Sequence, residues 1–499
     1  MGTSGHKATV YDLNGRMIGS CLCEYPTYYP ARSYVEQEPD DWWQAVCRAT
    51  RNLLEQTKIK PEDIAAVSFS GHMMGCLLVD DQGNPLGRSI IWADMRAKEQ
   101  EEFLKSRIPM EEFYRITGHR ISSSYGLAKL MWIRDHEPER YRKACRMLNA
   151  KDYIVYRLTG RLVTDYSDAS GTNLLDITAK KWSEDIAKAA GIDMNLLPEL
   201  LASTDVAGTV TPEAARETGL KEGTPVVIGG GDGSCAAAGA GVVQEGEIYN
   251  VIGSSSWISG ASAQPHFDPE MRTFNWVHVD KNLYTPCGTM QSAGFSYQWL
   301  RNTLCQEEMK QAKLEGRSAY DLINEKAAQA PPGSGGVLFL PYLMGERSPR
   351  WNSDATAVFL GLKATTGRNE LYRSVLEGVG YNLKIILDII SARFDKSSSV
   401  IVIGGGAKGE LWLQILADIW QREIVVPRYL EEATSMGAAL CAGVGIGAFR
   451  DFSVARTFNP PEKVIKPNPA NRNVYEKLFR AFNAAYETLV PVYCEMAAL

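Results

Sequence analysis

The sequence predicts an α/β protein built from two similar halves. Two features carry this prediction, and each occurs twice in the 499 residues. The first is a β-branched apolar run followed by glycines and a helical pattern, at 225–243 and at 400–419. The second is a turn rich in Gly, Ser and Thr beside a strand, at 2–5 and at 253–256. Because turn and glycine run recur in the same order, we expect two lobes of similar fold with a cleft between them.

The stretch 225–233 contains the main candidate for chemistry. We predict a buried strand at 225–228, after which the glycines at 229–231 let the backbone turn sharply and approach a ligand. Asp232 follows, and the Ala- and Gly-rich residues 234–243 predict a closely packed helix. Ligands of open α/β sheets bind at the carboxyl ends of strands. Asp232 is therefore either a functional carboxylate or a solvated residue in a plain strand–turn–helix connection.

The glycine turns are suited to a nucleoside triphosphate. Backbone N–H groups and Ser or Thr hydroxyls hold phosphates, and a turn without bulky side chains can lie flat against a purine and ribose. Neither glycine run matches the dinucleotide-binding pattern or the P-loop pattern. The candidate ATP- and phosphate-binding residues are the small residues of these turns and one nearby cation: Gly2, Thr3, Ser4, Lys7, Gly253, Ser254, Ser255, Gly404, Gly405, Gly406 and Ala407.

The first of these turns stands at the start of the chain. Residues 8–12 form a β pattern after it, so the turn resembles the middle of a hairpin whose first strand is missing. In the second half the hairpin is complete, with strands predicted at 248–252 and from 257 onward. A flexible tail is the alternative interpretation of residues 2–5.

Two other predicted strand ends in the first half are candidates for substrate binding. A strand at 64–69 leads into a loop that contains His72, and an apolar pair at 90–91 leads into an aromatic residue and opposite charges. The alternatives to substrate binding are a structural role for His72 and an ion pair between Asp94 and Arg96. For a sugar ligand, an indole would cover the C–H face and polar groups would bond the hydroxyls. The candidate substrate-binding residues are His72, Met73, Met74, Trp92, Asp94 and Gly233.

Composition and charge argue against several classes of function, although a local basic patch stays open. Apolar content of 45% and charged content of 22% are ordinary for a globular protein. The formal net charge of −6 argues against a nucleic-acid surface. The small and apolar run 235–243 is too short to cross a membrane, and the N-terminus has no signal core. Ten scattered cysteines without a secretory signal predict a cytoplasmic protein.

Three longer motifs resemble those of the FGGY family of carbohydrate kinases, and among its members the xylulokinases in particular. The stretch 357–377 fits the family's C-terminal signature throughout. The stretch 129–136 fits the N-terminal signature, except that Gly126 stands where Pro, Ser or Thr is usual. Residues 342–349 resemble the family as well. The resemblance covers nearly the whole chain.

This resemblance implies two ribonuclease-H-like domains of the actin/hexokinase-like ATPase type, with an interdomain cleft. Residues 1–243 would bind the sugar and carry the catalytic base Asp232, and residues 244–499 would bind the nucleotide. The implied reaction is transfer of a phosphoryl group from ATP, with Mg²⁺, to a sugar hydroxyl. D-xylulose is the first expected substrate, giving D-xylulose 5-phosphate and ADP. No metal-ligating side chain is predicted, and the resemblance allows a homodimer.

Three departures from the family pattern leave more than one function open. Met1 takes the variable position of the family's Asp-x-Gly-Thr-Ser motif, so the Asp is absent, and we expect either a shortened chain or a weakened kinase. Met74 replaces the histidine expected to touch the sugar, and Gly233 replaces the usual asparagine. These two changes allow another ketose or polyol as substrate. A non-catalytic sugar or nucleotide sensor and an actin- or chaperone-like ATPase are the competing hypotheses from different classes of protein.

Overall fold

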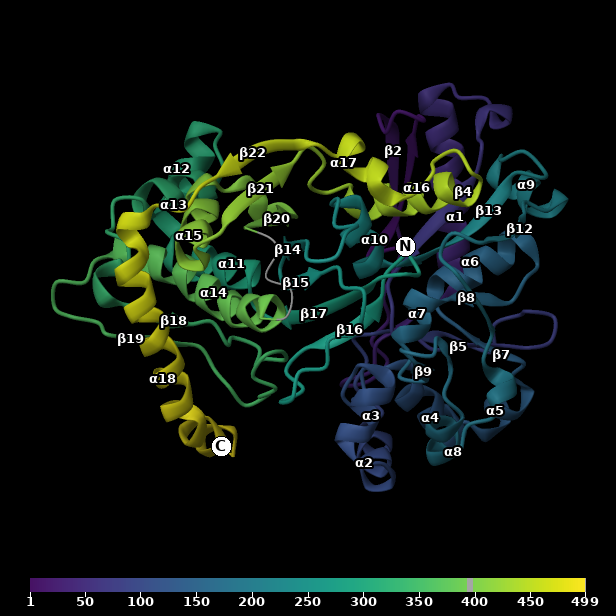
Figure 1. Cartoon of the computed structure of the whole chain (residues 1–499), viewed down its shortest axis with the longest axis horizontal. Coiled ribbons are helices and arrows are strands. Elements are labelled where there is room, and N and C mark those ends of the chain that lie inside the picture. Colours follow the sequence, from purple (N-terminus) through teal and green to yellow (C-terminus); the bar gives the residue numbers. More distant parts are fainter. Residues whose placement is uncertain (393–397, 499) are drawn as a thin grey trace.

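Each half of the chain is organised around one β-sheet that is larger than the two-stranded sheets beside it (Figure 1). The computed structural model describes residues 1–392 and 398–498. The sheet of the N-terminal half (residues 1–243) has the order β12-β13-β4. Strand β13 (Pro225–Gly231) runs parallel to β4 (Val67–Gly71) and antiparallel to β12 (Val206–Thr209). A separate antiparallel pair, β1 (Gly5–Tyr11) and β2 (Met17–Glu24), lies nearby.

Helices cover both faces of the N-terminal sheet because its strands alternate between two apolar clusters. Val226 and Ile228 of β13 belong to a core that includes α1 (Pro39–Thr57) and α6 (Ala150–Thr159). Val227, between them, belongs to a second core with Met436 of α16 (Ala433–Gly445). Successive side chains of a strand point to opposite faces. Helices α1 and α16 therefore lie on opposite sides of this sheet.

The C-terminal half (residues 244–499) contains a seven-stranded sheet and the largest apolar core. The core packs the buried face of this sheet against α14 (Arg368–Ser391), α15 (Glu410–Trp420) and α18 (Arg472–Ala497). The strands follow the order β16 (Phe274–Val277), β17 (Tyr284–Met290), β15 (Ser256–Gly260), β14 (Ile248–Ile252), β20 (Ser399–Ile403), β21 (Glu423–Pro427) and β22 (Pro461–Ile465).

The two halves are joined by a close contact between α16 and α10 (Asp232–Gly239), which lie side by side in the middle of the molecule (Figure 1). A Cβ atom built at Gly239 would lie 1.8 Å from the carbonyl oxygen of Ala433. A Cβ built at Gly437 would lie 1.9 Å from the carbonyl oxygen of Cys235. Only glycine therefore permits this approach. Although α16 comes late in the chain, it packs against the sheet of the N-terminal half.

Most of the expected elements are confirmed. The hairpin of β14 and β15, the strand β20 and the helix α15 occupy the predicted stretches. The α/β class and the two-lobed architecture are confirmed as well. Strand β4 begins later than predicted and continues through Gly71, which had been assigned to the following loop.

The prediction for the main glycine run was partly wrong. The glycines at 229–231 belong to β13 and do not form a turn after it, and α10 ends at Gly239 instead of 243. The pairing of β13 with β4 shifts register between Val227 and Gly230, and Gly229 has a φ of 71°. A Cβ atom at Gly229 would lie 1.9 Å from the carbonyl oxygen of Phe69. The glycine run thus provides a bulge inside the strand, and the strand delivers Asp232 directly to the helix.

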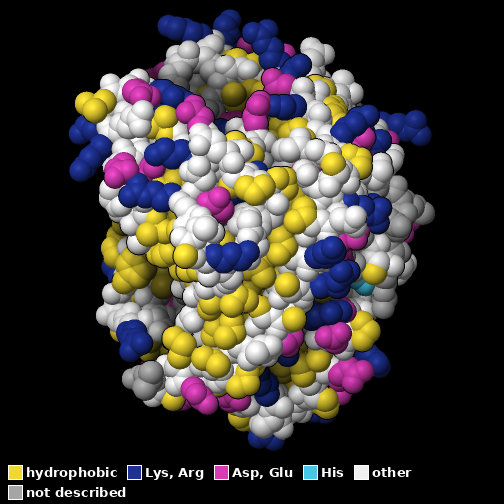
Figure 2. All heavy atoms as spheres, turned by 90° about the vertical axis from the view of Figure 1, so that its left-hand side faces the viewer, with side chains coloured by type: hydrophobic (Ala, Val, Ile, Leu, Met, Phe, Trp, Pro, Cys, Tyr) yellow, Lys and Arg dark blue, Asp and Glu magenta, His cyan; other side chains and the backbone are white. Residues whose placement is uncertain are grey.

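The outer face of the C-terminal half carries a band of hydrophobic side chains with basic and acidic side chains interspersed around it (Figure 2). Exposed hydrophobic residues of α18 and of the neighbouring strand β19 (Val358–Leu360) belong to this half. They are Leu360, Val492 and Met496. Within the described residues, none of the helices is both long enough and apolar enough to span a bilayer.

The contact between α10 and α16 leads to a stability prediction. We expect Gly437→Ala to lower the free energy of unfolding by about 1–3 kcal/mol, because the added methyl group overlaps a backbone carbonyl that cannot rotate away. This loss would outweigh the gain of about 1 kcal/mol that alanine ordinarily brings to a helix. Thermal and urea denaturation measure the difference.

Gly409→Ala is the matched control, since a Cβ at Gly409 would meet its neighbours only at ordinary distances, the nearest at 3.7 Å. Its unfolding free energy should stay within about 0.5 kcal/mol of the parent protein. Equal stability of the Gly437→Ala variant and the parent would contradict the close contact between the helices.

Candidate active site

Asp232 stands where β13 ends and α10 begins. Its Oδ1 accepts a hydrogen bond of 2.7 Å from the backbone N–H of Gly233, and the residue is half-buried. Burial raises the pKa of Asp232 to about 6, while the Gly233 hydrogen bond and the Met1 amino group act in the opposite direction. A carboxylate with this pKa is largely ionised at neutral pH and is still a competent proton acceptor.

A buried polar cluster holds the strand end beneath Asp232. The backbone N–H of Gly231 donates to Ser167 Oγ at 2.9 Å, and Ser167 Oγ donates to Asp165 at 2.5 Å. The ammonium group of Lys151 lies 2.7, 3.1 and 3.5 Å from carboxylate oxygens of Asp152, Asp165 and Asp168. These buried contacts give Asp165 and Ser167 a structural role beneath the strand end.

Asp232 also lies at the junction of the two halves. Tyr249 of β14 donates its hydroxyl to the carbonyl oxygen of Gly233 at 2.8 Å, and Trp257 of β15 donates its indole N–H to Tyr249 Oη at 3.1 Å. These bonds connect the residue next to the carboxylate with the sheet of the C-terminal half. Asp232 therefore faces the interlobe region, as a shared site requires.

The first glycine turn lies near the same sheet edge. Met1 pairs with β4, since its amino group donates to Ser70 O at 2.6 Å and His72 N–H donates to Met1 O at 2.9 Å. Gly2 and Ser4 are exposed, whereas Thr3 Oγ1 accepts a bond of 3.0 Å from the indole of Trp92.

Lys7, on β1 beyond this turn, reaches across to the segment that precedes α16. Its Nζ donates to Glu431 O at 3.2 Å and lies 3.6 Å from Glu432 Oε1. Two of the predicted phosphate ligands, Thr3 and Lys7, thus have protein partners in this conformation.

The two glycine turns of the C-terminal half lie side by side. Strands β14 and β20 are parallel neighbours, so their carboxyl ends bring 253–255 and 404–406 to one sheet edge. A Cβ at Gly406 would lie 2.4 Å from the side chain of Ile252, which is why the turn can pack so closely. Gly405 and the turn 253–255 are exposed, while Ala407 is buried in the core of this half. The backbone of these exposed turns is therefore accessible to a nucleotide, whereas the buried Ala407 side chain is not.

The loop predicted to touch the substrate is only partly placed to do so. His72 is buried edge-on against Trp42 at 5.7 Å between ring centroids, and burial lowers the pKa of His72 to about 3. Met73 packs against Gly231, the residue before Asp232. Met74 has a positive φ of 65°, and its carbonyl oxygen accepts a hydrogen bond of 2.8 Å from Lys129. Met73 therefore approaches the end of β13 that leads into Asp232, whereas His72 does not.

Asp94 does not reach a ligand in this structure. It is fully buried, and Arg96 donates to both carboxylate oxygens at 2.7–3.0 Å. The backbone N–H of Val35 donates to the same carboxylate at 2.5 Å. The Asp94–Arg96 ion pair that the sequence allowed is therefore confirmed. The suggestion that Asp94 binds a sugar is wrong for this conformation, because its oxygens already have partners away from solvent.

Sequence reasoning missed an aromatic cluster that joins the halves beside Met73. His119 Nδ1 and Tyr125 Oη form a hydrogen bond of 2.9 Å, and the His119 ring lies 4.5 Å from that of Trp276 in β16. Burial raises the pKa of Tyr125 to about 12, and the nearby Arg347 guanidinium opposes this rise. These residues are far apart in the chain and share no periodic pattern. The motif at 342–349, which contains Arg347, was the available signal.

Among the described residues there is no group of three or more His, Cys, Asp or Glu side chains placed to hold a metal ion. Mg²⁺ in phosphoryl-transfer sites is held by one or two carboxylates together with substrate phosphates and water. Asp232 and the exposed glycine turns fit an ion that arrives with the nucleotide, and they do not fit an ion bound by protein alone.

A half-buried carboxylate at the junction of two lobes, with glycine turns from both, is the arrangement expected of a phosphotransferase. Models of the FGGY family of carbohydrate kinases match residues 1–239 with the N-terminal domain and residues 248–446 with the C-terminal domain. The chain belongs to this family.

Individual relatives agree with this assignment. The chain is 32% identical to the xylulose kinase of Bacillus subtilis (strain 168) over 487 residues, which cover 97% of this chain and 95% of the relative. It is 31% identical to the gluconokinase of the same strain over 501 residues, covering 100% and 94%. The crystal structure of ligand-bound xylulose kinase from Lactobacillus acidophilus superposes with a TM-score of 0.92 at 28% identity, covering 99% and 98%.

The raised pKa of Asp232 predicts a pH profile. If this carboxylate accepts a proton, kcat/KM should be constant above about pH 7 and fall about tenfold for each unit below pH 6, because protonation removes the base. Steady-state rates between pH 4.5 and 8 test this, with circular dichroism at each pH to verify folding. Activity that stays level down to pH 4.5, as for an ordinary aspartate, would argue against this role.

Proposed function

We propose that the protein transfers the γ-phosphoryl group of ATP to a hydroxyl of a small ketose, with D-xylulose as the first substrate and D-xylulose 5-phosphate and ADP as products. The observation that carries this proposal is the position of Asp232. This half-buried carboxylate follows the end of β13, has a pKa raised to about 6, and is connected to the other half through Gly233 and Tyr249.

In this proposal each half has its own task. Residues 1–243 bind the sugar, and Asp232 removes the proton from the attacking hydroxyl. Residues 244–499 bind ATP through the backbone of the turns at 253–255 and 404–406, while residues 2–4 contribute further N–H and hydroxyl groups to the phosphates. Mg²⁺ carried with ATP would neutralise charge on the phosphates, and closure of the halves would exclude water.

The identity of the sugar is the finer part of the proposal. Xylulose kinases and gluconokinases both occur among the relatives at similar identity. Met74 and Gly233 each lack the hydrogen-bonding side chain expected in a xylulokinase. A site without those groups discriminates less strongly among polyols. Another ketose, a sugar acid or a sugar alcohol is the second candidate, and a catalytically weakened sugar-binding protein is the third.

Two wider expectations accompany the proposal. All ten cysteines are free thiols, which fits the cytoplasm that the sequence predicts. The band of hydrophobic side chains on the outer face of the C-terminal half is the surface we expect a homodimer to use (Figure 2). Light scattering coupled to size-exclusion chromatography measures whether one or two chains are present.

Replacement of the base tests the reaction directly. Asp232→Asn keeps the shape of the side chain and removes its basicity, so we expect kcat to fall by about 10²–10⁴-fold. The dissociation constant of ATP should stay within about threefold, since the turns that bind phosphate are untouched. Coupled ADP-release assays measure kcat, and isothermal titration calorimetry measures the dissociation constant of ATP.

Asp81→Asn, in an exposed turn between β5 (Leu77–Val79) and β6 (Ser89–Ile90), is the matched control and should behave like the parent protein. Near-parental turnover by Asp232→Asn would show that another group takes the proton.

A substrate panel separates the candidates. We expect sugar-stimulated ADP release with D-xylulose and compare kcat/KM with other pentuloses, gluconate and sugar alcohols. A Cβ atom at Gly233 would meet no atom within 4 Å, so Gly233→Asn has room for an amide. This variant should raise kcat/KM for D-xylulose by about tenfold, the value of one added hydrogen bond of ~1.4 kcal/mol.

Two results would count against the kinase proposal or its preferred substrate. One result is that no sugar stimulates ADP release, even when the chain is extended by an apolar strand that ends in Asp-x. This result would favour the hypothesis of a non-catalytic sugar or nucleotide sensor. A higher kcat/KM for gluconate than for D-xylulose would mean that the protein is a sugar kinase whose preferred substrate is gluconate.

A further inference from the structure

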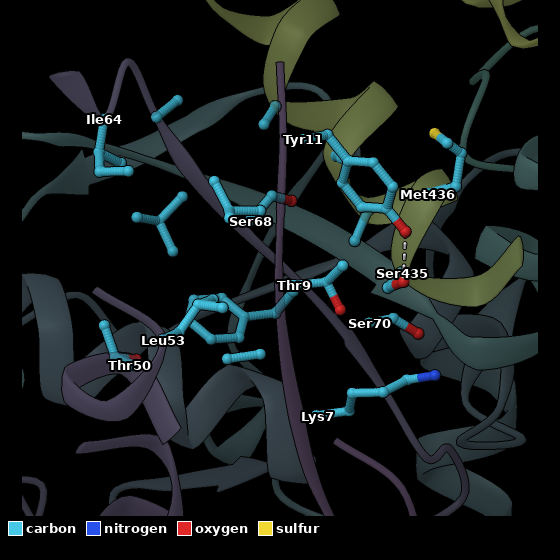
Figure 3. Close-up of a pocket in the computed structure, with 18 of the residues that line it drawn as sticks. Lys7, Thr9, Tyr11, Thr50, Leu53, Ile64, Ser68, Ser70, Ser435 and Met436 are labelled. Atoms are coloured by element: carbon cyan, nitrogen blue, oxygen red, sulfur yellow. Dashed lines mark hydrogen bonds between the residues drawn. The ribbon is translucent and has the colours of Figure 1, made fainter. Parts of the chain in front are cut away.

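Three lysines near the junction of the two halves already have protein partners. Lys7 borders a cavity of about 750 Å³ between β1 and β4 (Figure 3), and its ammonium group contacts the segment that precedes α16. Lys151 lies among three buried carboxylates, and Lys129 donates to two backbone carbonyl oxygens. Two arginines at the junction, Arg120 and Arg347, differ from these lysines.

Arg120 and Arg347 come from different halves of the chain and lie against the same side chain. The guanidinium carbon of Arg120 lies 5.1 Å from the ring centroid of Trp351, and that of Arg347 lies 5.9 Å from the same centroid. The indole therefore brings two positive charges close together where the halves meet. Because like charges repel, this arrangement is most favourable when an anion lies near both.

No protein carboxylate balances these two charges. In residues 1–392 and 398–498, neither side chain forms an ion pair, whereas Arg96 and Arg373, whose side chains are buried, each lie 2.7 Å from a carboxylate oxygen. Arg120 and Arg347 are themselves half-buried, and burial lowers the pKa of Arg120. Charged groups that are withdrawn from water normally have a partner of opposite charge, so we expect this partner to come from a ligand.

Glu346, the neighbour of Arg347 in the chain, does not supply that charge. Its carboxyl group accepts hydrogen bonds of 2.9 Å from the backbone N–H of Gln291 and from the amide of Asn382. Burial raises the pKa of Glu346 to about 8, so this group is mostly protonated and neutral at pH 7.

Strand β16 connects the two arginines with α10, the helix that begins at the candidate base. Just before the strand, a backbone carbonyl oxygen accepts a bond of 3.1 Å from the indole N–H of Trp351. At its other end, Val277 O accepts a bond of 2.8 Å from Ser234 Oγ of α10. Between these ends, Phe274 and Trp276 project from one face into the aromatic cluster at the junction. The arginines and the start of α10 therefore lie at opposite ends of one aromatic wall.

The charges at both ends of this wall act on a single buried thiol. Burial raises the pKa of Cys287 to about 12, while the Arg347 guanidinium lowers it and the Asp232 carboxylate raises it. Both charged groups are therefore close to Cys287. One small ligand along the wall would place one end at the guanidinium groups and the other at Asp232.

We propose that Arg120 and Arg347 form an anion subsite opposite Asp232, and that the protein also phosphorylates sugar acids whose carboxylate binds there. This inference rests on the proposed kinase function and adds a class of acceptor to it. The planar fork of guanidinium donors matches the two oxygens of a carboxylate. In the reaction, a hydroxyl oxygen at the other end of the acid bonds to the γ-phosphorus of ATP, its proton passes to Asp232, and the bond between this phosphorus and ADP breaks.

Matched pairs of an acid and its alcohol test the subsite, because each pair differs only in the group that would contact the arginines. The pairs are D-gluconate with D-sorbitol, and D-xylonate with xylitol. We expect kcat/KM for each acid to exceed that for its alcohol by at least about tenfold, the effect of a hydrogen bond to a charged group. The ratio should decrease as salt is added, since ions screen the attraction.

Arginine variants show which side chains cause the preference. Arg120→Gln and Arg347→Gln should each lower the ratio of acid to alcohol kcat/KM by about tenfold. Arg115→Gln is the matched control, since Arg115 is exposed on α3 (Met110–Thr117) and pairs with Glu111, and it should leave the ratio unchanged. Equal losses for acid and alcohol would indicate a structural role. An unchanged ratio with a raised KM for ATP would assign the arginines to the nucleotide. Either result would overturn the proposal.

Binding without turnover separates this inference from the kinase proposal. Isothermal titration calorimetry should detect D-gluconate binding in the absence of nucleotide, and the variant with both arginines replaced by glutamine should lose it. If D-xylulose is phosphorylated but the acids have no advantage over their alcohols, the subsite is wrong and the kinase remains. If no acceptor is turned over, arginine-dependent binding of D-gluconate would support the subsite alone, and its absence would reject both.

Discussion

The close contact between α10 and α16 is the constraint on which the rest of the structure depends. Gly239 and Gly437 let the two helices meet backbone to backbone, which no larger residue at either position permits. One helix begins with Asp232, and the other is a late segment of the chain packed against the N-terminal sheet. A carboxylate from one half and a segment from the other are therefore fixed relative to each other, and the site between the halves requires this arrangement.

The electrostatics around Asp232 follow from that placement. Below it, Lys151 sits among three buried carboxylates, so this cluster supports β13 through Ser167 without exposing charge. Among the described residues, no ion pair involves the side chain of Asp232. Backbone hydrogen bonds from Gly233 and from Asp232 itself, together with the Met1 amino group, lower its pKa, but the effect of burial is larger. The result is a carboxylate that is ionised at neutral pH yet remains basic. This balance is suited to accepting a proton from a sugar hydroxyl.

The sequence predicted those features that depend on neighbouring residues in the chain, and it did not predict those that depend on contacts between distant segments. A β-branched run, three glycines and an acid placed Asp232 at a strand end, and the repeat of turn and glycine run predicted the two lobes. Periodicity could not show that Gly229 forms a bulge, because the reason is a carbonyl of Phe69 on the neighbouring strand. It also could not choose between a sugar ligand and Arg96 for Asp94, nor bring His119 to Trp276, since both outcomes depend on tertiary contacts.

The most direct test of the central claim is a crystal structure with D-xylulose and a non-hydrolysable ATP analogue bound together. We predict that a carboxylate oxygen of Asp232 lies about 2.6–3.2 Å from the sugar hydroxyl that faces the γ-phosphate. The phosphates should lie against the turns at 2–4, 253–255 and 404–406. A triphosphate bound away from these turns, or an acceptor hydroxyl turned away from Asp232 toward another base, would contradict the account.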